Sequence, residues 1–328
     1  FTNSHVGSLT GTTSITAGDT TNIIGGQVLG EKVTLNTTDL NIESLQDTAT
    51  YDSKQMSASG QVTIGYGFSA SGSYSNSNID SDYASVGEQS GILAGDGGYN
   101  INVTKDTSLI GGIITSTQSA EDNKLNSFST GTLIASNIDN FSRYDGDSFG
   151  ISASASYSNS NAPTDSNLYN PDSTGVGKSI GYGEDSDSQT STTYSGINTS
   201  NITITGNTDN SHPELVSGSK EITAANLADI FTSTTTDQVE ANSGALANNF
   251  DAAAVQNELD VQTRVTQTFD TNRQEIKAEI NSVIDEAKTI ADDKSGKYTQ
   301  EQIAEANQKI EDMQHLGVLV DSISGALY

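Results

Sequence analysis

Apolar residues in the first part of the chain alternate with polar ones over short distances. Single Thr or Asn residues separate Val33 from Leu35 and Leu40 from Ile42. This period of two is typical of β-strands, and the Gly, Asp and Asn residues between the apolar pairs mark turns. We therefore predict strands of three to five residues, with Ile15 to Leu35 spanning about one turn of a β-solenoid.

A longer alternation interrupts this pattern. Ser, Gly and Asn fill the positions between a row of apolar, aromatic and small residues: Val62, Ile64, Tyr66, Phe68, Ala70, Gly72 and Tyr74. We interpret residues 62–74 as one unbroken strand, part of a long strand or hairpin that leaves the solenoid. Two such excursions are predicted, at about 48–90 and 140–195. A flexible Ser/Asn/Gly linker is the alternative.

The two excursions share a dodecapeptide, which is one part of a longer internal repeat. GFSASGSYSNSN starts at Gly67 and GISASASYSNSN starts at Gly150, and they agree at ten of twelve positions. In the same order along the chain, Ile-Gly-Gly occurs at 24–26 and 110–112, and Ser-Gly-Ile at 90–92 and 195–197. The order predicts two copies of one unit, residues 20–104 and 106–205, with insertions in loops.

The pattern becomes helical after about Asp209. The apolar positions that follow helical spacing are 255, 259, 265, 269, 276, 280, 283, 284, 287 and 290. Thr299 and Gln302 form a capping box at the start of a second helix. We predict helices at about 223–231, 252–292 and 300–315.

The predicted fold is therefore mainly β. It is a right-handed parallel β-helix with two long β-hairpin excursions, followed by an α-helical C-terminal segment. The predicted domains are residues 1–209 and 210–328. The chain starts at Phe1 and ends on an apolar stretch at Tyr328, so we expect it to be an internal fragment of a longer protein.

Composition agrees with stacked repeats and excludes several partners. The chain is 33% apolar and has a formal net charge of −28, which is little apolar material for one globular core. Repeats that stack on each other need only a narrow core. The acidic excess argues against nucleic acid and against anionic membrane surfaces. The absence of Cys excludes disulfides, thiolate metal sites and Cys nucleophiles.

The sequence offers little catalytic chemistry. None of its three histidines, His5, His212 and His315, has a Ser or second His at triad or ligand spacing. We expect His315 to end a helix, where the helix dipole explains it. Asp19 and Asp106 precede turns, and we interpret both as turn-forming residues.

Two acidic stretches are similar in composition to calcium loops. RYDGDSFG contains Asp145 and Asp147, and GEDSDS contains Asp185 and Asp187. Neither has the Glu at the twelfth position that completes an EF-hand loop. We therefore predict no catalytic residue, no cofactor site and no metal site.

Several long stretches resemble one known family. LNIESLQDTATYDSKQ, EQSGILAGDGGYNINV, GGIITSTQSAEDNKLNSFSTGTLIASNIDN and SGINTSNITI closely resemble the haemagglutinin-repeat region of CdiA proteins, the effectors of contact-dependent growth inhibition. Filamentous haemagglutinins of two-partner secretion share that region. The stretch NSGALANNFDAAAVQNELDVQTRVTQTFDTNRQEIKAEIN resembles the helical segment that leads to the pretoxin part.

The resemblance implies a secreted, non-catalytic segment of a surface filament on the exterior of the Gram-negative outer membrane. The implied partners are an outer-membrane two-partner secretion transporter, the target-cell surface or outer membrane, and a C-terminal toxin domain in the full-length protein. No nucleic acid is implied. The Val-Glu-Asn-Asn junction that often precedes the toxin does not occur in this sequence.

Alternatives remain at this stage. The first alternative is an adhesin of the filamentous haemagglutinin type without toxin delivery. A β-helical polysaccharide-active enzyme is less favoured, and a phage-like fibre is the last alternative. The alternating excursions have the pattern of membrane β-hairpins. They are expected either to pair with each other or contact a membrane, or to pack as an extra sheet on the solenoid.

Overall fold

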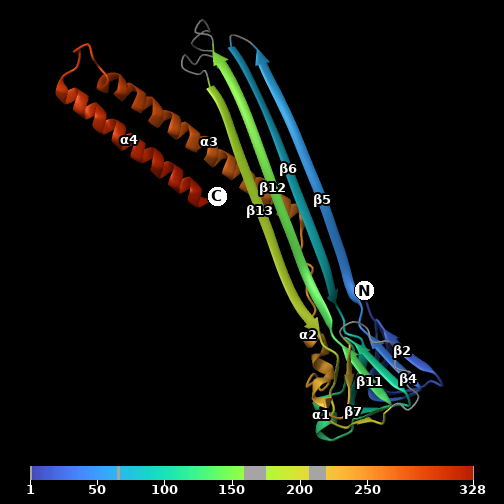
Figure 1. The fold of residues 1–328 in the computed structure, drawn as a ribbon. Helices are drawn as coiled ribbons and strands as arrows, with labels where there is room; N and C mark the ends of the chain where they lie inside the picture. Colours follow the sequence, from blue (N-terminus) through green and yellow to red (C-terminus); the bar gives the residue numbers. More distant parts are fainter. Residues whose placement is uncertain (1, 65–66, 159–174, 207–218, 328) are drawn as a thin grey trace. The chain divides into compact units, whose positions relative to one another are not determined.

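The computed structural model describes residues 2–64, 67–158, 175–206 and 219–327. The structure is mainly β with a helical C-terminal segment, as predicted (Figure 1). Contacts divide it into two compact units. Unit 1 contains Phe1–Tyr51, Asp80–Tyr144 and Ser186–Phe250, and unit 2 contains Asp52–Ile79, Asp145–Asp185 and Asp251–Tyr328. These units interleave along the chain, whereas the predicted domains follow one another.

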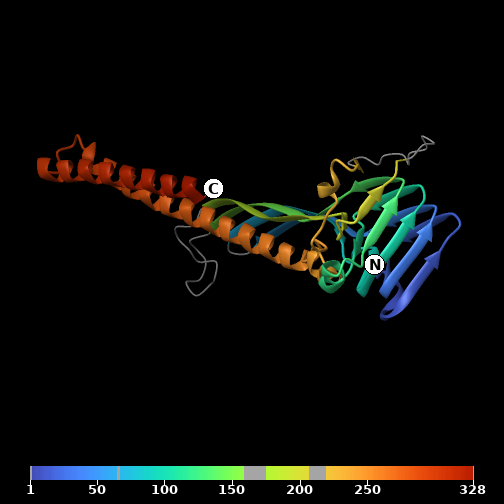
Figure 2. The ribbon, with the colours of Figure 1, turned by 90° about the horizontal axis from the view of Figure 1, so that it is seen from below.

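Unit 1 contains two sheets of parallel strands that the chain visits in turn (Figure 2). The first sheet has the order β1-β3-β7-β10-β15, with β9 and β14 alongside, and the second has the order β2-β4-β8-β11-β16. Among the described strands of these two sheets, β11 and β16 form the only antiparallel pair. The first-sheet strands are β1 (Ser4–Thr16), β3 (Gly26–Thr37), β7 (Gly91–Val103), β9 (Ile113–Thr115), β10 (Ser127–Thr130), β14 (Gly196–Ile197) and β15 (Ile202–Ile204). The second-sheet strands are β2 (Thr20–Ile24), β4 (Asp39–Glu43), β8 (Asp106–Ile110), β11 (Thr132–Ser136) and β16 (Lys220–Ile222).

The core of unit 1 consists of apolar residues stacked in register. Ile15 pairs with Leu35, as the sequence predicted for one turn, and Leu35 pairs with Ile101. Phe128 pairs with both Ile101 and Ile202 and extends the same column. Leu35, Ile101 and Phe128 belong to one cluster of buried side chains with residues from the second sheet, and Ile15 and Ile202 pack against it, partly buried. A few apolar residues per turn therefore form a continuous narrow core.

Three strands of the first sheet are longer than predicted. β1, β3 and β7 have 12 or 13 residues each, whereas strands of three to five residues were expected. Irregularities between Ser8 and Thr12 and between Gly30 and Lys32 divide the ladders. The strands continue past these irregularities, because a bulge bends a strand without ending its pairing.

The third sheet has four long strands in the order β13-β12-β6-β5. They are β5 (Gln46–Ile64), β6 (Gly67–Val86), β12 (Ile138–Ser158) and β13 (Gly175–Thr193). The prediction of one unbroken strand over 62–74 is wrong, because this stretch is divided between the neighbouring strands β5 and β6. Tyr66 lies outside the described residues. The two excursions do pair with each other, through β6 and β12.

The internal repeat is confirmed at its turns. Gly25 and Gly111 have φ angles of +57° and +56°, a left-handed conformation that favours glycine. The amide of the following glycine donates to a serine Oγ in each copy, Ser90 at 3.1 Å for the first and Ser195 at 3.3 Å for the second. These serines are the pair that the sequence comparison matched.

The dodecapeptides, in contrast, do not occupy equivalent strands. The first copy begins β6, the second strand of its hairpin, and the second copy ends β12, the first strand of its hairpin. Residues 159–161 of the second copy lie outside the described residues. The two copies lie on the neighbouring strands β6 and β12. Asn78 Nδ2, at the end of the first copy, donates to both carboxylate oxygens of Asp147, three residues before the second copy, at 3.1 and 3.3 Å. The similar sequences therefore give these adjacent strands the same pattern of side chains.

The helical segment differs in detail from its prediction. α3 (Ala252–Ala291) matches the predicted helix, and Asp251 caps its first turn. The Thr299–Gln302 capping box is confirmed, with hydrogen bonds of 2.9 and 3.2 Å. α4 (Gln300–Leu327) extends beyond the predicted end at 315. The small helices are α1 (Gln118–Asp122), η1 (Leu227–Asp229), η2 (Thr236–Gln238) and α2 (Val239–Asn242), so 223–231 contains only one 3₁₀ turn.

α3 and α4 pack along each other as a helical hairpin in unit 2 (Figure 1). Asp321 on α4 accepts hydrogen bonds from Lys277 Nζ at 2.9 and 2.8 Å, and Arg273 lies 3.8 Å from the same carboxylate. Such half-exposed ion pairs contribute little stability. The packing of Ile280, Ile284 and Ala287, which are buried on α3, holds the pair together.

Candidate functional site

The two long hairpins share a buried polar root in unit 1. Asn140 on β12 is 1% exposed, and its Oδ1 accepts from the backbone amide of Val86 on β6 at 3.0 Å. Its Nδ2 donates to Thr193 Oγ1 on β13 at 2.9 Å and to the carbonyl of Gly244 at 3.0 Å. Its Oδ1 also accepts from Gln46 Nε2 on β5 at 3.2 Å, so one side chain ties all four long strands together. Nearby, Phe250 packs against Tyr51 and Tyr144, with ring centroids 5.3 and 5.7 Å away.

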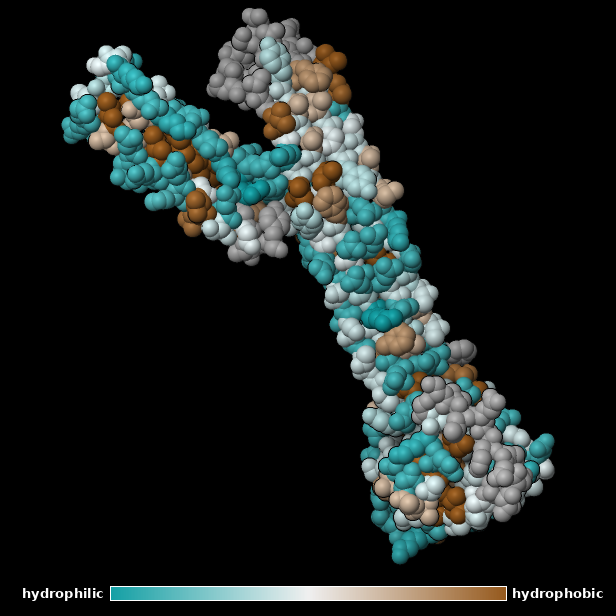
Figure 3. Space-filling view, in the orientation of Figure 1, coloured by the Kyte–Doolittle hydropathy of each residue, from teal (hydrophilic) through white to brown (hydrophobic). Residues whose placement is uncertain are grey.

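Beyond the root, the long-strand sheet in unit 2 has two chemically different faces. One face, called the Ser/Gly face, contains Ser77, Gly146, Ser148, Gly150, Ser179, Gly181 and Gly183, all of them buried. The other, called the apolar face, contains large apolar residues that are exposed. They are Met56, Val62, Ile64, Phe68, Tyr74, Ile151, Tyr157, Val176, Ile180 and Tyr182, assigned to this face by alternation along each strand. Brown patches over the long strands mark such residues (Figure 3).

α3 lies against the Ser/Gly face because that face has almost no side-chain volume. A Cβ atom on Gly181 would lie 2.3 Å from the carbonyl oxygen of Thr263, and one on Gly183 would lie 2.8 Å from that of Leu259. Ser148 Oγ lies 2.5 Å from Thr263 Oγ1. The glycines thus allow the helix backbone to approach the strand backbone directly.

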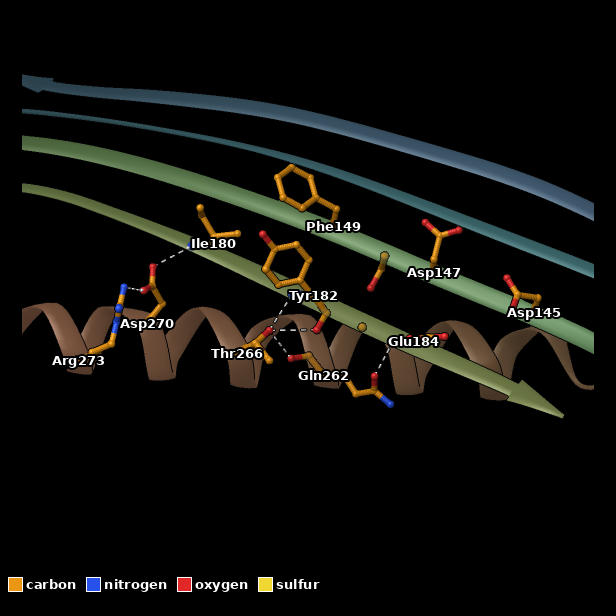
Figure 4. A pocket seen from close by; sticks show the side chains of 12 residues that line it. Asp145, Asp147, Phe149, Ile180, Tyr182, Glu184, Gln262, Thr266, Asp270 and Arg273 are labelled. Carbon is orange, nitrogen blue, oxygen red and sulfur yellow. Dashed lines mark hydrogen bonds and ion pairs between the residues drawn. The ribbon is translucent and has the colours of Figure 1, made fainter. Parts of the chain in front are cut away.

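α3 also covers the backbone edge of β13, the outermost strand of the sheet. Three amides of this edge donate to side chains of α3: Ile180 to Asp270 Oδ2 at 3.1 Å, Tyr182 to Thr266 Oγ1 at 2.8 Å, and Glu184 to Gln262 Oε1 at 2.8 Å. We call these three bonds the edge ladder (Figure 4).

The edge ladder works because two periodicities agree. Four residues of helix rise about 6 Å, and two residues of strand extend by about 6.7 Å. Side chains at 262, 266 and 270 therefore meet every second amide of β13. An edge strand with unpaired amides is a template for another strand, and the edge ladder occupies that template.

An open hollow of about 840 Å³ lies beside the edge ladder. Its lining contains the rings of Phe149 and Tyr182, with centroids 5.5 Å apart, and the carboxylates of Asp145, Asp147 and Glu184 (Figure 4). Asp270 closes one end through a 2.7 Å ion pair with Arg273. The hollow is open, so it resembles a contact surface more than an enclosed ligand pocket.

The histidines and turn aspartates occupy separate places. His5 Nε2 lies 2.5 Å from Glu88 Oε1 in unit 1, and His212 lies outside the described residues. The expectation that His315 ends a helix is wrong, because α4 continues to Leu327 and the helix dipole does not explain its position. Asp106 begins β8, and its carboxylate accepts from Thr132 Oγ1 at 2.5 Å.

The acidic stretches compared with calcium loops are strands. Asp145 and Asp147 lie on β12, and Asp185 and Asp187 lie on β13. In the described part of the chain, no group of three or more His, Asp or Glu side chains is arranged to hold a metal ion. The edge ladder was not predicted from the sequence. The sequence shows only the i, i+4, i+8 spacing of Gln262, Thr266 and Asp270. Their partners are backbone amides, which the sequence does not distinguish from other amides.

Comparison with known proteins agrees with the repeat architecture. Residues 1–58 match the family model described as "Hemagglutinin repeat". Similarity to CdiA proteins extends further. These similarities support membership of the CdiA and filamentous haemagglutinin family.

Three relatives illustrate the similarity. The chain is 45% identical over 136 residues to the tRNA nuclease CdiA of Yersinia mollaretii, 40% over 147 residues to the deoxyribonuclease CdiA of Dickeya dadantii, and 44% over 146 residues to the toxin CdiA of Escherichia coli. These matches cover 40%, 44% and 43% of this chain, but 4% of each relative. No solved structure matches the chain significantly. Within the described residues, no helix has the length and apolar character needed to cross a membrane.

Proposed function

We propose that this chain is a non-catalytic segment of a surface filament of a contact-dependent growth-inhibition effector, and that it serves delivery of a toxin to neighbouring cells. The similarity to CdiA relatives from three genera supports this role. The proposed partners are an outer-membrane two-partner secretion transporter, the surface or outer membrane of the target cell, and a C-terminal toxin domain of the full-length protein. The proposed location is the exterior of the Gram-negative outer membrane.

The proposed architecture of residues 1–209 is a right-handed parallel β-helix. Its support is the in-register column of Ile15, Leu35, Ile101, Phe128 and Ile202 and the alternation of the chain between two parallel sheets. Such a coil folds without disulfides, which suits the absence of Cys. A chain without disulfides also passes more easily through a narrow transporter in an extended state.

The single observation that carries the delivery role is the exposed apolar face. Large apolar side chains that gather on one face of a sheet and stay exposed favour contact with another apolar surface. Here long antiparallel strands combine an exposed apolar face with a Ser/Gly face, which is the pattern of strands that contact lipid on one side only. We therefore assign the apolar face to contact with the target outer membrane.

Vesicle flotation tests this assignment. The full chain is mixed with phosphatidylcholine vesicles, which are zwitterionic and do not repel a chain of net charge −28. The face variant replaces Phe68, Ile151 and Tyr157, which are 45%, 40% and 60% exposed, with Ser. The matched control replaces three exposed apolar residues of unit 1, namely Val6, Leu9 and Ile24, with Ser.

The wild type and the control are expected to float with the vesicles. Burying half of a large apolar side chain contributes about 1 kcal/mol, so three losses lower partitioning on the order of 100-fold in the face variant. A wild type that stays with the soluble fraction contradicts membrane contact, and so does a face variant that floats as well as the control.

A further inference from the structure

The edge of β13 is covered in an unusual way, because side chains rather than a strand satisfy its amides. Asp270, Thr266 and Gln262 accept from three alternate amides. The contacts of Gly181 and Gly183 with α3 involve backbone carbonyl oxygens of the helix. Lifting α3 by a few ångströms would therefore release all three amides at once and leave β13 ready to pair with another strand.

The sequence of this edge is complementary to itself in the antiparallel direction. Residues 178–184 read Lys-Ser-Ile-Gly-Tyr-Gly-Glu. When two copies are paired about Gly181, Lys178 lies opposite Glu184 and Ile180 lies opposite Tyr182, and each pair occurs twice. The even-numbered residues are also those whose amides point outward, because the edge ladder binds 180, 182 and 184. The register therefore agrees with antiparallel hydrogen bonding.

The exposure of the side chains favours the same pairing. Lys178, Ile180, Tyr182 and Glu184 are all exposed, whereas Ser179, Gly181 and Gly183 are buried under α3. Opposite charges and an aromatic–aliphatic pair directly across from each other stabilise strand pairs. A twofold axis through Gly181 gives a closed, isologous interface between two chains.

We infer that the β13 edge is a strand-addition site for a second copy of this chain, and that α3 closes the site through the edge ladder. The two copies pair antiparallel about Gly181 with Lys178 opposite Glu184 of the second copy. α3 and the second β13 compete for the same amides. The chain therefore dimerises through this edge in proportion to how often α3 leaves it. This inference does not depend on the proposed function, since it requires neither a membrane nor a toxin.

A pair of triple variants tests the competition. The ladder variant replaces Gln262, Thr266 and Asp270 with Ala. The matched control replaces Thr268, Asn272 and Glu275 with Ala; these residues are exposed on the same helix, and their replacement also removes one hydroxyl, one amide and one carboxylate. Sedimentation equilibrium is expected to give a dimer dissociation constant at least about ten-fold lower for the ladder variant than for the control, with α-helix content checked by circular dichroism. Equal dissociation constants for the two variants overturn the inference.

Charge reversal in the ladder variant tests the register. Lys178→Glu alone places two negative charges opposite each other, and Glu184→Lys alone places two positive charges opposite each other. Like charges directly opposite each other destabilise a strand pair. Each is expected to weaken the dimer by at least about five-fold, and the double variant is expected to restore it. Single and double variants that associate equally indicate nonspecific aggregation and refute the pairing.

Disulfide cross-linking provides a test that does not need the ladder variant to fold well. The chain has no Cys, so each introduced thiol is unique. In the otherwise wild-type sequence, a mixture of Lys178→Cys and Glu184→Cys chains is expected to form covalent heterodimers under mild oxidation. Either chain alone is expected to cross-link far less, because its thiols would lie about 20 Å apart in the pair. Equal cross-linking in the mixture and the separate chains contradicts the proposed register.

Discussion

Replacing either turn glycine of the internal repeat with Ala should destabilise unit 1 by a similar amount. Gly25 and Gly111 both adopt a left-handed backbone, with φ angles of +57° and +56°. A Cβ atom would lie 2.7 Å from Leu45 Cδ1 in the first copy and 2.6 Å from Ile138 Cδ1 in the second. The two positions therefore serve as internal replicates of one perturbation.

The magnitude follows from two contributions. A left-handed conformation costs an L-residue about 1–2 kcal/mol. The steric contact adds less than about 1 kcal/mol, because the atoms that must move are the ends of flexible side chains. We expect each variant to lose about 1–3 kcal/mol in the free energy of unfolding. Gly18→Ala is the control, since Gly18 has no left-handed φ and a Cβ atom there would meet no heavy atom within 4 Å.

Urea unfolding followed by far-ultraviolet circular dichroism measures the effect. The two variants should shift the midpoint downward with an unchanged slope, which reports unchanged exposure of surface on unfolding. Gly18→Ala should leave the midpoint in place or raise it slightly, because Ala restricts the unfolded chain. A loss at one glycine but not at the other would refute the equivalence of the two repeat turns.

Three further predictions concern other parts of the molecule. Gly181→Ala should lower the stability of unit 2 by about 1–3 kcal/mol, because the added Cβ meets a backbone carbonyl of α3. In the control Gly177→Ala the added Cβ meets only a movable serine hydroxyl, so the effect should be smaller. Thermal melting followed by circular dichroism at 222 nm compares the two variants. Asn140→Leu should lower the free energy of unfolding of unit 1 by about 2 kcal/mol or more, since it leaves buried backbone groups at the hairpin root without partners. A denaturation midpoint equal to that of the wild type would show that the root is not buried. The pKa of Asp293 is lowered to about 2, first by the hydrogen bond from the Ser295 hydroxyl and then by backbone amides. The ionised carboxylate therefore stabilises the folded chain above about pH 4, and this stabilisation is lost as the pH falls towards 2. A carboxyl titration by NMR with a midpoint near the ordinary value of 3.8 would contradict this.

The sequence predicts the stacked strands well because each turn repeats one local rule. The alternation of Val33 with Leu35 and of Leu40 with Ile42 places all four side chains in the core, at 0–1% exposure. Parallel stacking requires only that successive turns have similar lengths, so the pairing of Ile15 with Leu35 follows from the spacing. Local periodicity was therefore sufficient for this part of the fold.

The long-strand sheet was harder to predict because similar sequence does not fix strand direction. The two dodecapeptides occupy the second strand of one hairpin and the first strand of the other. Alternation alone gives the same pattern in both directions. β5 ends at Ile64 and β6 begins at Gly67, inside the row of apolar residues that suggested one strand.

The candidate site was not predictable from residue types. Gln262, Thr266 and Asp270 are ordinary residues for the surface of a helix, and their partners on β13 are amides that every residue except Pro possesses. The glycines of the Ser/Gly face gave a partial signal, since Gly181 and Gly183 weaken a strand unless another backbone approaches closely. The sequence does not identify α3 as that partner, because the paired residues are 78 to 90 positions apart.

Amide hydrogen exchange on β13 tests the edge ladder most directly. In the wild type, the amides of Ile180, Tyr182 and Glu184 are expected to exchange slowly and together, although β13 is an edge strand. Losing one hydrogen bond worth about 1.4 kcal/mol corresponds to a factor of about ten, so Thr266→Val should accelerate exchange at Tyr182 by about ten-fold, while Thr268→Val should leave it unchanged. Rapid exchange at all three amides in the wild type, or no difference between the two variants, would contradict the account.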